Sequence, residues 1–478
     1  TDIERLGMLH AKVLRSPHAH ARIVSVDASA AKDLAGVTAV LTRDDVEDLK
    51  LWGTLVKDQP AVACDRVRYV GDIVAAVAAV DERTAFRALD LIDVRYEVLP
   101  AVFDFDDAMD ERSPEIFSDA PLAIIPDYHA GASAAARVGH NISYQFSYHT
   151  GSGAVWDQCD HVFEDEFVFS RMNHMHLEPF VAVAEASPAA VELWSSTQSP
   201  FPLRRELSRI FSIPENRVRV HVPLLGGGFG AKNLPKADVV AIRLSQLSGG
   251  RPVRFAMTTE EVFLTISQHA ARLTVRTGVM ADGTFVARKS TVLLNGGAYS
   301  DLSPLVAEKA GYRMPGPYRW AHLDSTCKVV VTNTVPAGAF RGFGGAQANW
   351  ASERQVDMIA ERLGMAPLEL RFQNIKRLGE EYVPGETSLD SDLAEGLRIV
   401  AAEIGYTDRD RRGNRGMGIS VGAKDGGGVN KPAQARVKIS TNGDVFLSSG
   451  LTEMGQGGHS ALCQIVAEVL KCPRERVG

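Results

Sequence analysis

The sequence predicts a mixed α/β (α+β) protein, and three observations lead to this prediction. Short apolar runs typical of strands alternate with segments whose apolar residues recur at helical spacing. Two dipeptides, Asp282-Gly283 and Asn442-Gly443, each separate a pair of strand-like runs and therefore predict hairpins. The 478 residues are enough for two or three domains, each with its own core. We therefore expect an N-terminal α/β domain followed by domains of mixed sheets and helices.

Individual elements follow from local signals. Asp81 is a typical N-cap, Gly364 and Gly405 are typical helix stops, and the last helix should bury one apolar stripe. The expected strands are Val37–Leu41, Ile73–Val80, Val94–Val98, Val162–Ser170, Val191–Thr197, Arg217–Val222, Arg272–Met280, Thr284–Leu294, Ala435–Ser440 and Val445–Ser449. Six helices are expected. The first follows Asp81, the second includes Leu203–Ile210, the third starts at Ala237 and the fourth ends at Gly364. The fifth spans Asp392–Ile404, and the last carries the stripe Leu462, Ile465, Val466, Val469 and Leu470.

Composition and patterning divide the chain into four stretches. Residues 1–100 combine strand-like runs with a helical segment, as in a small α/β domain. Residues 101–140 hold an acidic cluster, three prolines and an Ala/Gly-rich stretch, so we expect a linker. Residues 141–405 contain one hairpin signal, and residues 416–478 contain the other. We expect these two stretches to form the second and third domains.

Bulk properties exclude several classes of protein. The net charge of -7, without any basic block, argues against nucleic-acid binding. The most apolar run, Ile73–Val80, is too short to span a bilayer. The N-terminal residues show no signal-peptide pattern, and the five cysteines are widely spaced without a CxxC pair. We therefore expect a cytoplasmic protein that holds neither a disulfide framework nor an iron–sulfur cluster of its own.

Three glycine clusters dominate the sequence: Leu225–Asn233, Ala339–Gln347 and Glu453–His459. The first lies between the strand at Arg217–Val222 and the helix that starts at Ala237. Glycine allows the backbone to approach a ligand closely, and N–H groups near a helix start bind anions. The clusters therefore predict a site for a large, polar, phosphorylated cofactor.

Two common phosphate-binding motifs fit the sequence less well than the hypothesis that all three clusters hold one cofactor. A P-loop requires glycine before the lysine and a hydroxyl residue after it, and Lys232 has neither. Gly226, Gly228 and Ala231 satisfy a dinucleotide-binding pattern, but the acidic residue expected about 20 positions later is missing. Tight turns alone would explain one cluster rather than three, two of which contain Gly-Phe-Gly. Polar side chains within or near the clusters are Gln198, Lys232, Arg341, Gln347 and Gln456.

Histidines offer a weaker signal. His18 and His20 lack a third ligand, which favours a structural or surface role over a metal site. His174, His176 and Glu178 are spaced by two and share one face if the segment is extended. A metal site and hydrogen-bonded polar residues beside a pocket are both open, and the second is the more common arrangement.

The three clusters, in this order, resemble the signatures of the xanthine dehydrogenase/aldehyde oxidase family of molybdenum hydroxylases. The segments that carry the resemblance are Leu225–Lys232, Ala339–Gly345 and Glu453–Gly457, and the resemblance extends over essentially the whole chain. It implies the large, molybdenum-binding subunit, with a family-type N-terminal domain and two molybdopterin-binding domains. It also implies hydroxylation of an electron-poor carbon, in an N-heterocycle or an aldehyde, with water as the oxygen source.

The resemblance further implies which residues hold the cofactor, a molybdenum-molybdopterin that in bacteria is often the cytosine dinucleotide form. Gln198 matches a glutamine that hydrogen-bonds the apical oxo ligand, and Gln456 matches one that contacts the pterin. Arg341 matches an arginine whose backbone lies near the metal. The pterin itself holds the metal, so no direct protein ligand is expected. The cofactor-binding residues implied in this way are Gln198, Gly228, Phe229, Gly230, Arg341 and Gln456.

Three further residues are implied for the substrate pocket. Phe343 matches the aromatic residue that stacks on a ring substrate. Asn233 stands where purine-oxidising members have an acidic residue, and Lys309 stands where they have an arginine. A second aromatic residue is missing from 424–428, so xanthine itself is not expected as the substrate. Gly342 replaces a cysteine found in carbon monoxide dehydrogenases of the family, which disfavours that branch.

No catalytic residue is identified in this chain. The family's general base is a glutamate in a glycine-rich motif; no such motif follows Gly458, and Glu386 comes too early. We expect either a fragment or a split subunit whose active site is completed by a second molybdopterin subunit. Electron transfer would need 2Fe–2S and FAD subunits as partners. The alternatives are a non-catalytic cofactor-binding or assembly subunit and, less favoured, a nicotinamide-dependent dehydrogenase.

Overall fold

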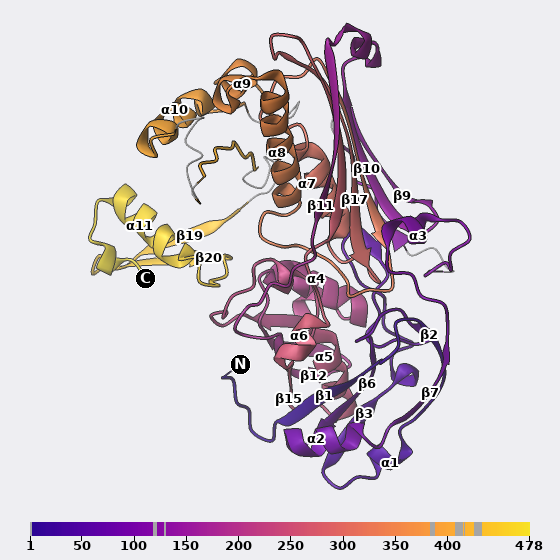
Figure 1. Ribbon diagram of the computed structural model, residues 1–478. Helices are drawn as coiled ribbons and strands as arrows, with labels where there is room; N and C mark the ends of the chain where they lie inside the picture. Colours follow the sequence, from indigo (N-terminus) through magenta and orange to yellow (C-terminus); the bar gives the residue numbers. More distant parts are fainter. Residues whose placement is uncertain are drawn as a thin grey trace.

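The computed structural model describes residues 2–117, 122–128, 131–382, 388–406, 414, 416–424 and 433–478. Glu386 and residues 425–428 lie outside the described residues. Figure 1 shows two lobes, each built on a large sheet, and a small C-terminal unit beside them. The first lobe contains most of residues 2–100 and 181–263, and the second contains the six-stranded sheet and α7 and α8.

The first lobe is organised around a seven-stranded sheet with the order β14-β13-β12-β15-β1-β6-β3. Its strands are β1 (Leu9–Arg15), β3 (Val37–Leu41), β6 (Ile73–Ala79), β12 (Val181–Ser187), β13 (Ala190–Ser195), β14 (Val218–His221) and β15 (Val253–Ala256). β1 pairs in parallel with β15, with Leu9 opposite Val253. The stretch predicted as a domain at 1–100 therefore shares a sheet with residues 181–256, a long-range pairing that no local signal indicates.

A three-stranded sheet completes this lobe, with the order β5-β2-β7. Its strands are β2 (Ala21–Asp27), β5 (Arg66–Val67) and β7 (Asp93–Val98). The expected strands at 37–41, 73–80 and 94–98 are confirmed to within a residue. Apolar side chains of β6 are buried on both faces, against α2 (Glu82–Leu89) on one and α5 (Asp238–Leu247) on the other, which explains why β6 reads as one continuous apolar run.

The second lobe is organised around a six-stranded sheet with the order β11-β16-β17-β18-β10-β9. Its strands are β9 (Ala132–Gly139), β10 (Ile142–Thr150), β11 (His161–Phe169), β16 (Ala271–Val279), β17 (Phe285–Gly297) and β18 (His322–Val331). The hairpin predicted at Asp282-Gly283 is confirmed by the antiparallel pairing of β16 and β17. β9 pairs with β10 although it lies in the predicted linker at 101–140. β9 consists largely of alanine and is poor in the β-branched residues that mark a strand.

α7 and α8 cover one face of the six-stranded sheet (Figure 1). Asp81 caps α2, because its side chain accepts a hydrogen bond from the Thr84 N–H, and α8 ends at Gly364 with a φ of 67°. Both predicted helix boundaries are thus confirmed. The helices are α1 (Ser29–Lys32), α2 (Glu82–Leu89), α3 (Phe105–Met109), α4 (Pro200–Phe211), α5 (Asp238–Leu247), α6 (Thr259–Phe263), α7 (Ser303–Arg313), α8 (Gly345–Leu363), α9 (Pro367–Asn374), α10 (Leu393–Glu403) and α11 (Gly458–Leu470).

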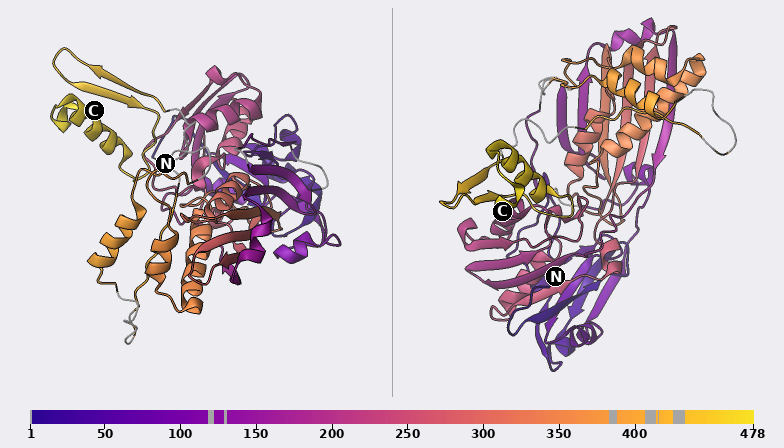
Figure 2. Two further views of the ribbon diagram at one scale, coloured as in Figure 1. Left: turned by 90° about the horizontal axis from the view of Figure 1, so that it is seen from above. Right: turned by 90° about the vertical axis from the view of Figure 1, so that its left-hand side faces the viewer.

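The C-terminal unit consists of β19 (Ala435–Ile439), β20 (Val445–Ser449) and α11, and Figure 2 shows that it projects away from the two lobes. The predicted hairpin and final helix are confirmed. The buried stripe predicted on α11 is wrong in part. Cys463 and Ala467 are buried, whereas Ile465 and Val469 are 59% and 74% exposed, because the two-stranded hairpin covers only one side of the helix.

Candidate functional site

The three glycine clusters meet where the two lobes and the C-terminal unit adjoin. Gln198, at the end of the segment after β13, accepts a hydrogen bond at Oε1 from the Gly230 N–H at 3.0 Å. The Arg341 N–H donates to the Phe229 carbonyl oxygen at 3.0 Å, which joins the second cluster to the first. The Leu225 N–H donates to the carbonyl oxygen of Glu453 at 3.0 Å, which joins the third cluster to the first. Segments far apart in the chain thus form one site.

Glycine is required sterically in the first cluster. A Cβ atom on Gly228 would overlap the side-chain amide of Gln198. Gly230 has a φ of +103°, and a Cβ atom there would lie 2.7 Å from the Ala339 carbonyl oxygen. Close packing between the clusters therefore excludes any side chain at these two positions.

Both Gly-Phe-Gly sequences place their phenylalanine in the left-handed region of backbone conformation. The φ angles are 51° for Phe229 and 48° for Phe343. This conformation is rare for a bulky residue and costs on the order of 1–3 kcal/mol. Strain of this kind persists where the surrounding contacts impose it, and it is common at ligand-binding sites.

The donors of the site suit an oxygen-rich, anionic cofactor. Within the described residues, the backbone N–H groups of Gly227, Gly228 and Phe229 donate to no other residue. The Arg341 side chain is exposed, and no described acidic residue forms an ion pair with it. The buried Oε1 atom of Gln347 also has no hydrogen-bond partner. Amide, guanidinium and carboxamide groups of this type recognise phosphate and pterin heteroatoms.

A buried ion pair stabilises the first cluster. The Lys232 ammonium, whose side chain is fully buried, lies 2.9 Å from Glu178 Oε2. The same oxygen accepts a hydrogen bond from the Gly226 N–H at 3.0 Å. Burial lowers the pKa of Lys232, and the neighbouring Glu178 carboxylate opposes this shift.

The histidines predicted beside the site are hydrogen-bonded. His174 Nε2 lies 2.7 Å from the Ala339 carbonyl oxygen, and His176 Nδ1 lies 2.5 Å from the Glu178 carbonyl oxygen. Burial, together with the Lys232 charge, lowers the pKa of His176 to about 4, so the ring is neutral at neutral pH. The expectation of hydrogen-bonded polar residues is thus confirmed for both histidines.

The third cluster contacts Gln198 as well. Gln456 uses both ends of its amide within its own loop: Oε1 accepts from the Met454 N–H at 2.8 Å, and Nε2 donates to the Thr452 carbonyl oxygen at 2.7 Å. Thr452 Oγ1 donates to the Gln198 carbonyl oxygen at 3.1 Å, and Gln198 Nε2 lies 3.0 Å from the Met454 sulfur. Thr452 and Met454 are not among the predicted site residues, and their position in or beside the third cluster is the only signal for them in the sequence.

Two of the three residues expected in the substrate pocket lie on the α7 side. Lys309 is on α7, with its Nζ atom 2.8 Å from Glu308. Phe343 packs against the core that includes Val306 of α7. The second cluster rests directly on this helix, because a Cβ atom on Gly344 would lie 2.5 Å from the Val306 carbonyl oxygen.

Asn233 instead belongs to the first cluster, and none of the described contacts joins it to Lys309 or Phe343. Its Nδ2 group donates to the Gly230 carbonyl oxygen at 2.8 Å, and its Oδ1 atom accepts from Ser199 Oγ at 2.8 Å. Both ends of the amide therefore brace the loop. Its role in substrate choice stays a prediction.

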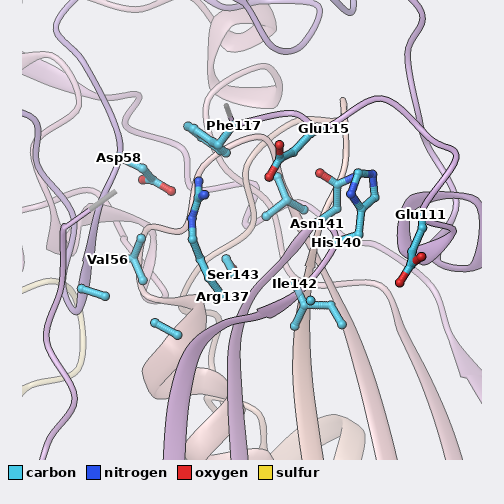
Figure 3. Close-up of a pocket in the computed structure, with 14 residues that line it drawn as sticks. Val56, Asp58, Glu111, Glu115, Phe117, Arg137, His140, Asn141, Ile142 and Ser143 are labelled. Carbon is cyan, nitrogen blue, oxygen red and sulfur yellow. The ribbon is translucent and has the colours of Figure 1, made fainter. Parts of the chain in front are cut away.

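The larger cavities lie away from most of these residues. One of about 560 Å³ lies between the first lobe and the β9–β10 edge, and Figure 3 shows Asp58 and Arg137 on one side of it and His140 on the other. Its described lining includes no residue predicted for the site. A groove of about 640 Å³ runs between α4, β14 and the third cluster, where Thr452 and Glu453 line it.

Comparison with known proteins gives consistent matches. Two models described as "Molybdopterin cofactor-binding domain" match residues 136–375 and 400–478. A third, "Aldehyde oxidase and xanthine dehydrogenase, a/b hammerhead domain", matches residues 1–100. No helix among the described residues is both long and apolar enough to cross a membrane.

Curated relatives cover the whole chain. The chain is 33% identical to a probable xanthine dehydrogenase subunit from Bacillus subtilis, over 100% of this chain and 63% of that protein. It is 32% identical to the "Nicotinate dehydrogenase large molybdopterin subunit" of Eubacterium barkeri, over 84% of this chain and 91% of that protein. The chain thus spans less than two thirds of the first relative and most of the second.

Solved structures share the fold. Quinoline 2-oxidoreductase from Pseudomonas putida 86 matches 100% of this chain and 63% of its own, with a TM-score of 0.81 and 28% identity. Reconstituted CO dehydrogenase from Oligotropha carboxidovorans matches 100% of this chain and 63% of its own, with a TM-score of 0.84 and 27% identity.

Proposed function

Because the chain belongs to the xanthine dehydrogenase/aldehyde oxidase family of molybdopterin cofactor-binding proteins, we propose that it is the molybdenum-binding subunit of a hydroxylating oxidoreductase. The proposed reaction adds a hydroxyl group, derived from water, to an electron-poor carbon. The bound molybdopterin would supply the two-electron redox chemistry. The observation that carries the proposal is the convergence of Gln198, of Phe229 in the first cluster and of Arg341 in the second on one set of hydrogen bonds.

We assign the chain's own residues the task of binding and orienting the cofactor. The free N–H groups around Gly228 and Phe229 would donate hydrogen bonds to its oxygens, and Arg341 would supply a positive charge. Gln198 presents its amide to the reacting centre, held in place by the N–H of Gly230. The Phe229 ring, next to the Gln198 and Gly230 contact, would lie beside the bound cofactor. Gln456 orders the loop that contacts the pterin.

We propose an N-heterocycle as the substrate class. Two relatives are named for such compounds, nicotinate and quinoline. Phe343 offers a ring for stacking, and Lys309 offers a cation on the same side of the site. Asn233 has no carboxylate and uses its amide within the first cluster, which argues against purine recognition.

We further infer that the active enzyme contains 2Fe–2S and FAD subunits. The exposed apolar residues Ile465 and Val469 of α11 support a further polypeptide against the C-terminal unit. We propose the cytosine dinucleotide form of the cofactor. A cytoplasmic location is supported by five cysteines that are all unpaired.

The test is to purify the chain with its partner subunits and to measure molybdenum by mass spectrometry and pterin by fluorescence. We expect about one of each per chain and reduction of an artificial acceptor by an N-heterocycle. Gln198→Ala should lower the turnover rate while molybdenum content remains. Bound molybdopterin with activity unaffected by Gln198→Ala would favour a non-catalytic assembly subunit, and a bound nicotinamide instead of molybdopterin would overturn the proposal.

A further inference from the structure

We propose that Glu178 is a positioning residue, which sets the location of the Gln198 side chain through Gly226 and Lys232. The proposal deepens the proposed function and rests on it, because it takes Gln198 as the group that meets the cofactor. In this proposal Glu178 acts through Gly226 and Lys232 and not by contact with the cofactor or the substrate.

Glu178 holds both ends of the first glycine cluster. Its backbone N–H donates to the Gly226 carbonyl oxygen at 3.1 Å, and its Oε2 atom accepts from the Gly226 N–H at 3.0 Å. The same oxygen lies 2.9 Å from the Lys232 ammonium. Gly226 has no room for a side chain, because a Cβ atom there would lie 2.5 Å from the Glu178 Cβ. One carboxylate therefore fixes the span between residues 226 and 232.

Lys232 passes this constraint to Gln198. The Gln198 N–H donates to the Lys232 carbonyl oxygen at 2.7 Å, and the Lys232 N–H donates to Gln198 Oε1 at 3.3 Å. Gly230, inside the span that Glu178 fixes, donates the other hydrogen bond to that oxygen. The position of the Gln198 amide is thus determined by a loop whose two ends share one anchor.

The same short segment also holds the second cluster. His174 lies four residues before Glu178, and its Nε2 atom contacts the Ala339 carbonyl oxygen at 2.7 Å. Its ring packs against Phe340 with centroids 4.7 Å apart. Residues 174–178 therefore fix the position of the first cluster relative to the second.

The charge of this pair is difficult to explain by stability alone. The Lys232 side chain is fully buried and that of Glu178 is 13% exposed. Buried ion pairs often contribute no more stability than apolar residues of similar volume, whereas loss of one partner leaves an uncompensated charge. The directional contacts of Glu178 with a backbone N–H and an ammonium give it a geometric role that an apolar residue could not perform.

The experiment uses the chain purified with its partner subunits and loaded with molybdopterin. Three variants are compared with the wild type: Glu178→Ala, Glu178→Gln and the neutral pair Glu178→Gln/Lys232→Met, which folds without a lone buried charge. Glu192→Gln is the matched control, because Glu192 forms an ion pair with Arg219 on the same sheet and lies outside the site. The readouts are molybdenum and pterin per chain, kcat and KM, and the electron paramagnetic resonance signal of reduced molybdenum.

We expect cofactor content within about twofold of the wild type for the neutral pair, a kcat lower by about 10- to 100-fold, an unchanged KM and an altered resonance signal. Glu178→Gln, which keeps an acceptor for the Gly226 N–H, should retain more activity than Glu178→Ala. In a Gln198→Ala background, Glu178→Ala should lower kcat by less than about threefold, because the residue acts through Gln198.

Two results would overturn the inference alone: an unchanged kcat and resonance signal in all three variants, or an undiminished effect of Glu178→Ala in the Gln198→Ala background. A wild-type complex that binds no molybdopterin would overturn the proposed function, and the inference with it. The resonance signal separates a positioning role from lost folding, since a merely structural defect lowers the amount of signal without changing its shape.

Discussion

Lys236 and Asp301 form a buried ion pair between the two lobes, with 2.6 Å between Nζ and Oδ2 and both side chains 3% exposed. Lys236 precedes α5 in the first lobe, and Asp301 precedes α7 in the second. The Asp301 carbonyl oxygen also accepts a hydrogen bond from the Thr54 N–H. The junction that positions the glycine clusters is therefore fixed by charge as well as by packing.

We expect Asp301→Asn to destabilise the protein by about 3–5 kcal/mol, because it leaves the Lys236 ammonium buried without a counter-charge. Chemical denaturation measures this change. Asp48→Asn, which breaks the exposed pair with Arg243, is the control and should cost less than about 1 kcal/mol. Equal losses in the two variants would show that the buried pair contributes nothing specific.

The stability of the first lobe should depend on pH through Asp58. Burial raises the pKa of Asp58 to about 7, above its value in the unfolded chain. The unfolded state therefore ionises first, and stability from this group falls as pH rises from about 4 to about 7, by at most about 4 kcal/mol. Relative to the wild type, Asp58→Asn should therefore become more stable as the pH rises from about 4 to about 7.

Thermal unfolding at several pH values tests the Asp58 prediction. Replacement of the exposed Asp33 by asparagine controls for the change of residue type. The contacts that Asp58 loses on replacement add an offset that does not vary with pH, because asparagine does not titrate. A difference between Asp58→Asn and the wild type that does not vary with pH would contradict the prediction.

Gly228→Ala should lower molybdopterin content by about tenfold or more, since the new methyl group displaces the Gln198 amide or the loop. Gly396→Ala on α10 is the matched control: no atom lies within 4 Å of its added Cβ, and helical propensity should make it neutral or slightly stabilising. Pterin fluorescence per chain is the measurement. Full pterin content in Gly228→Ala would mean that the close approach is not needed.

Phe229→Asn separates backbone strain from the function of the ring. Asparagine accepts the left-handed conformation at a φ of 51° more readily than phenylalanine, so the unfolding midpoint should stay equal or rise. Turnover should fall by about tenfold or more, which corresponds to about 1.4 kcal/mol of lost transition-state stabilisation. Lower stability with unchanged turnover would reverse the assignment of the ring to the site.

Local signals were predictable from the sequence, and long-range contacts were not. Asp81 and Gly364 end their helices as expected, because capping depends on neighbouring residues alone. The β9 strand was missed, since alanine carries no strand signal. The pairing of Glu178 with Lys232 joins residues whose types gave no indication of each other.

Family resemblance singled out residues that the fold brings together, whereas residue patterns alone did not. The chemistry of glycine and amide groups alone left a dinucleotide site open. The motif order singled out Gln198, Phe229 and Arg341, which the fold brings together. For Asn233 the resemblance was less informative. Its position in the motif did not indicate that its amide forms hydrogen bonds with Ser199 and Gly230.

The parallel pairing of β1 with β15 has a consequence for synthesis on the ribosome. Leu9 lies opposite Val253, so this edge of β1 has no partner until about 244 further residues have been translated. At about 5–20 residues per second, that delay is roughly 12 to 50 s. A nascent-chain chaperone could bind during this interval at the unpaired edge of the first strand, before the glycine clusters have come together.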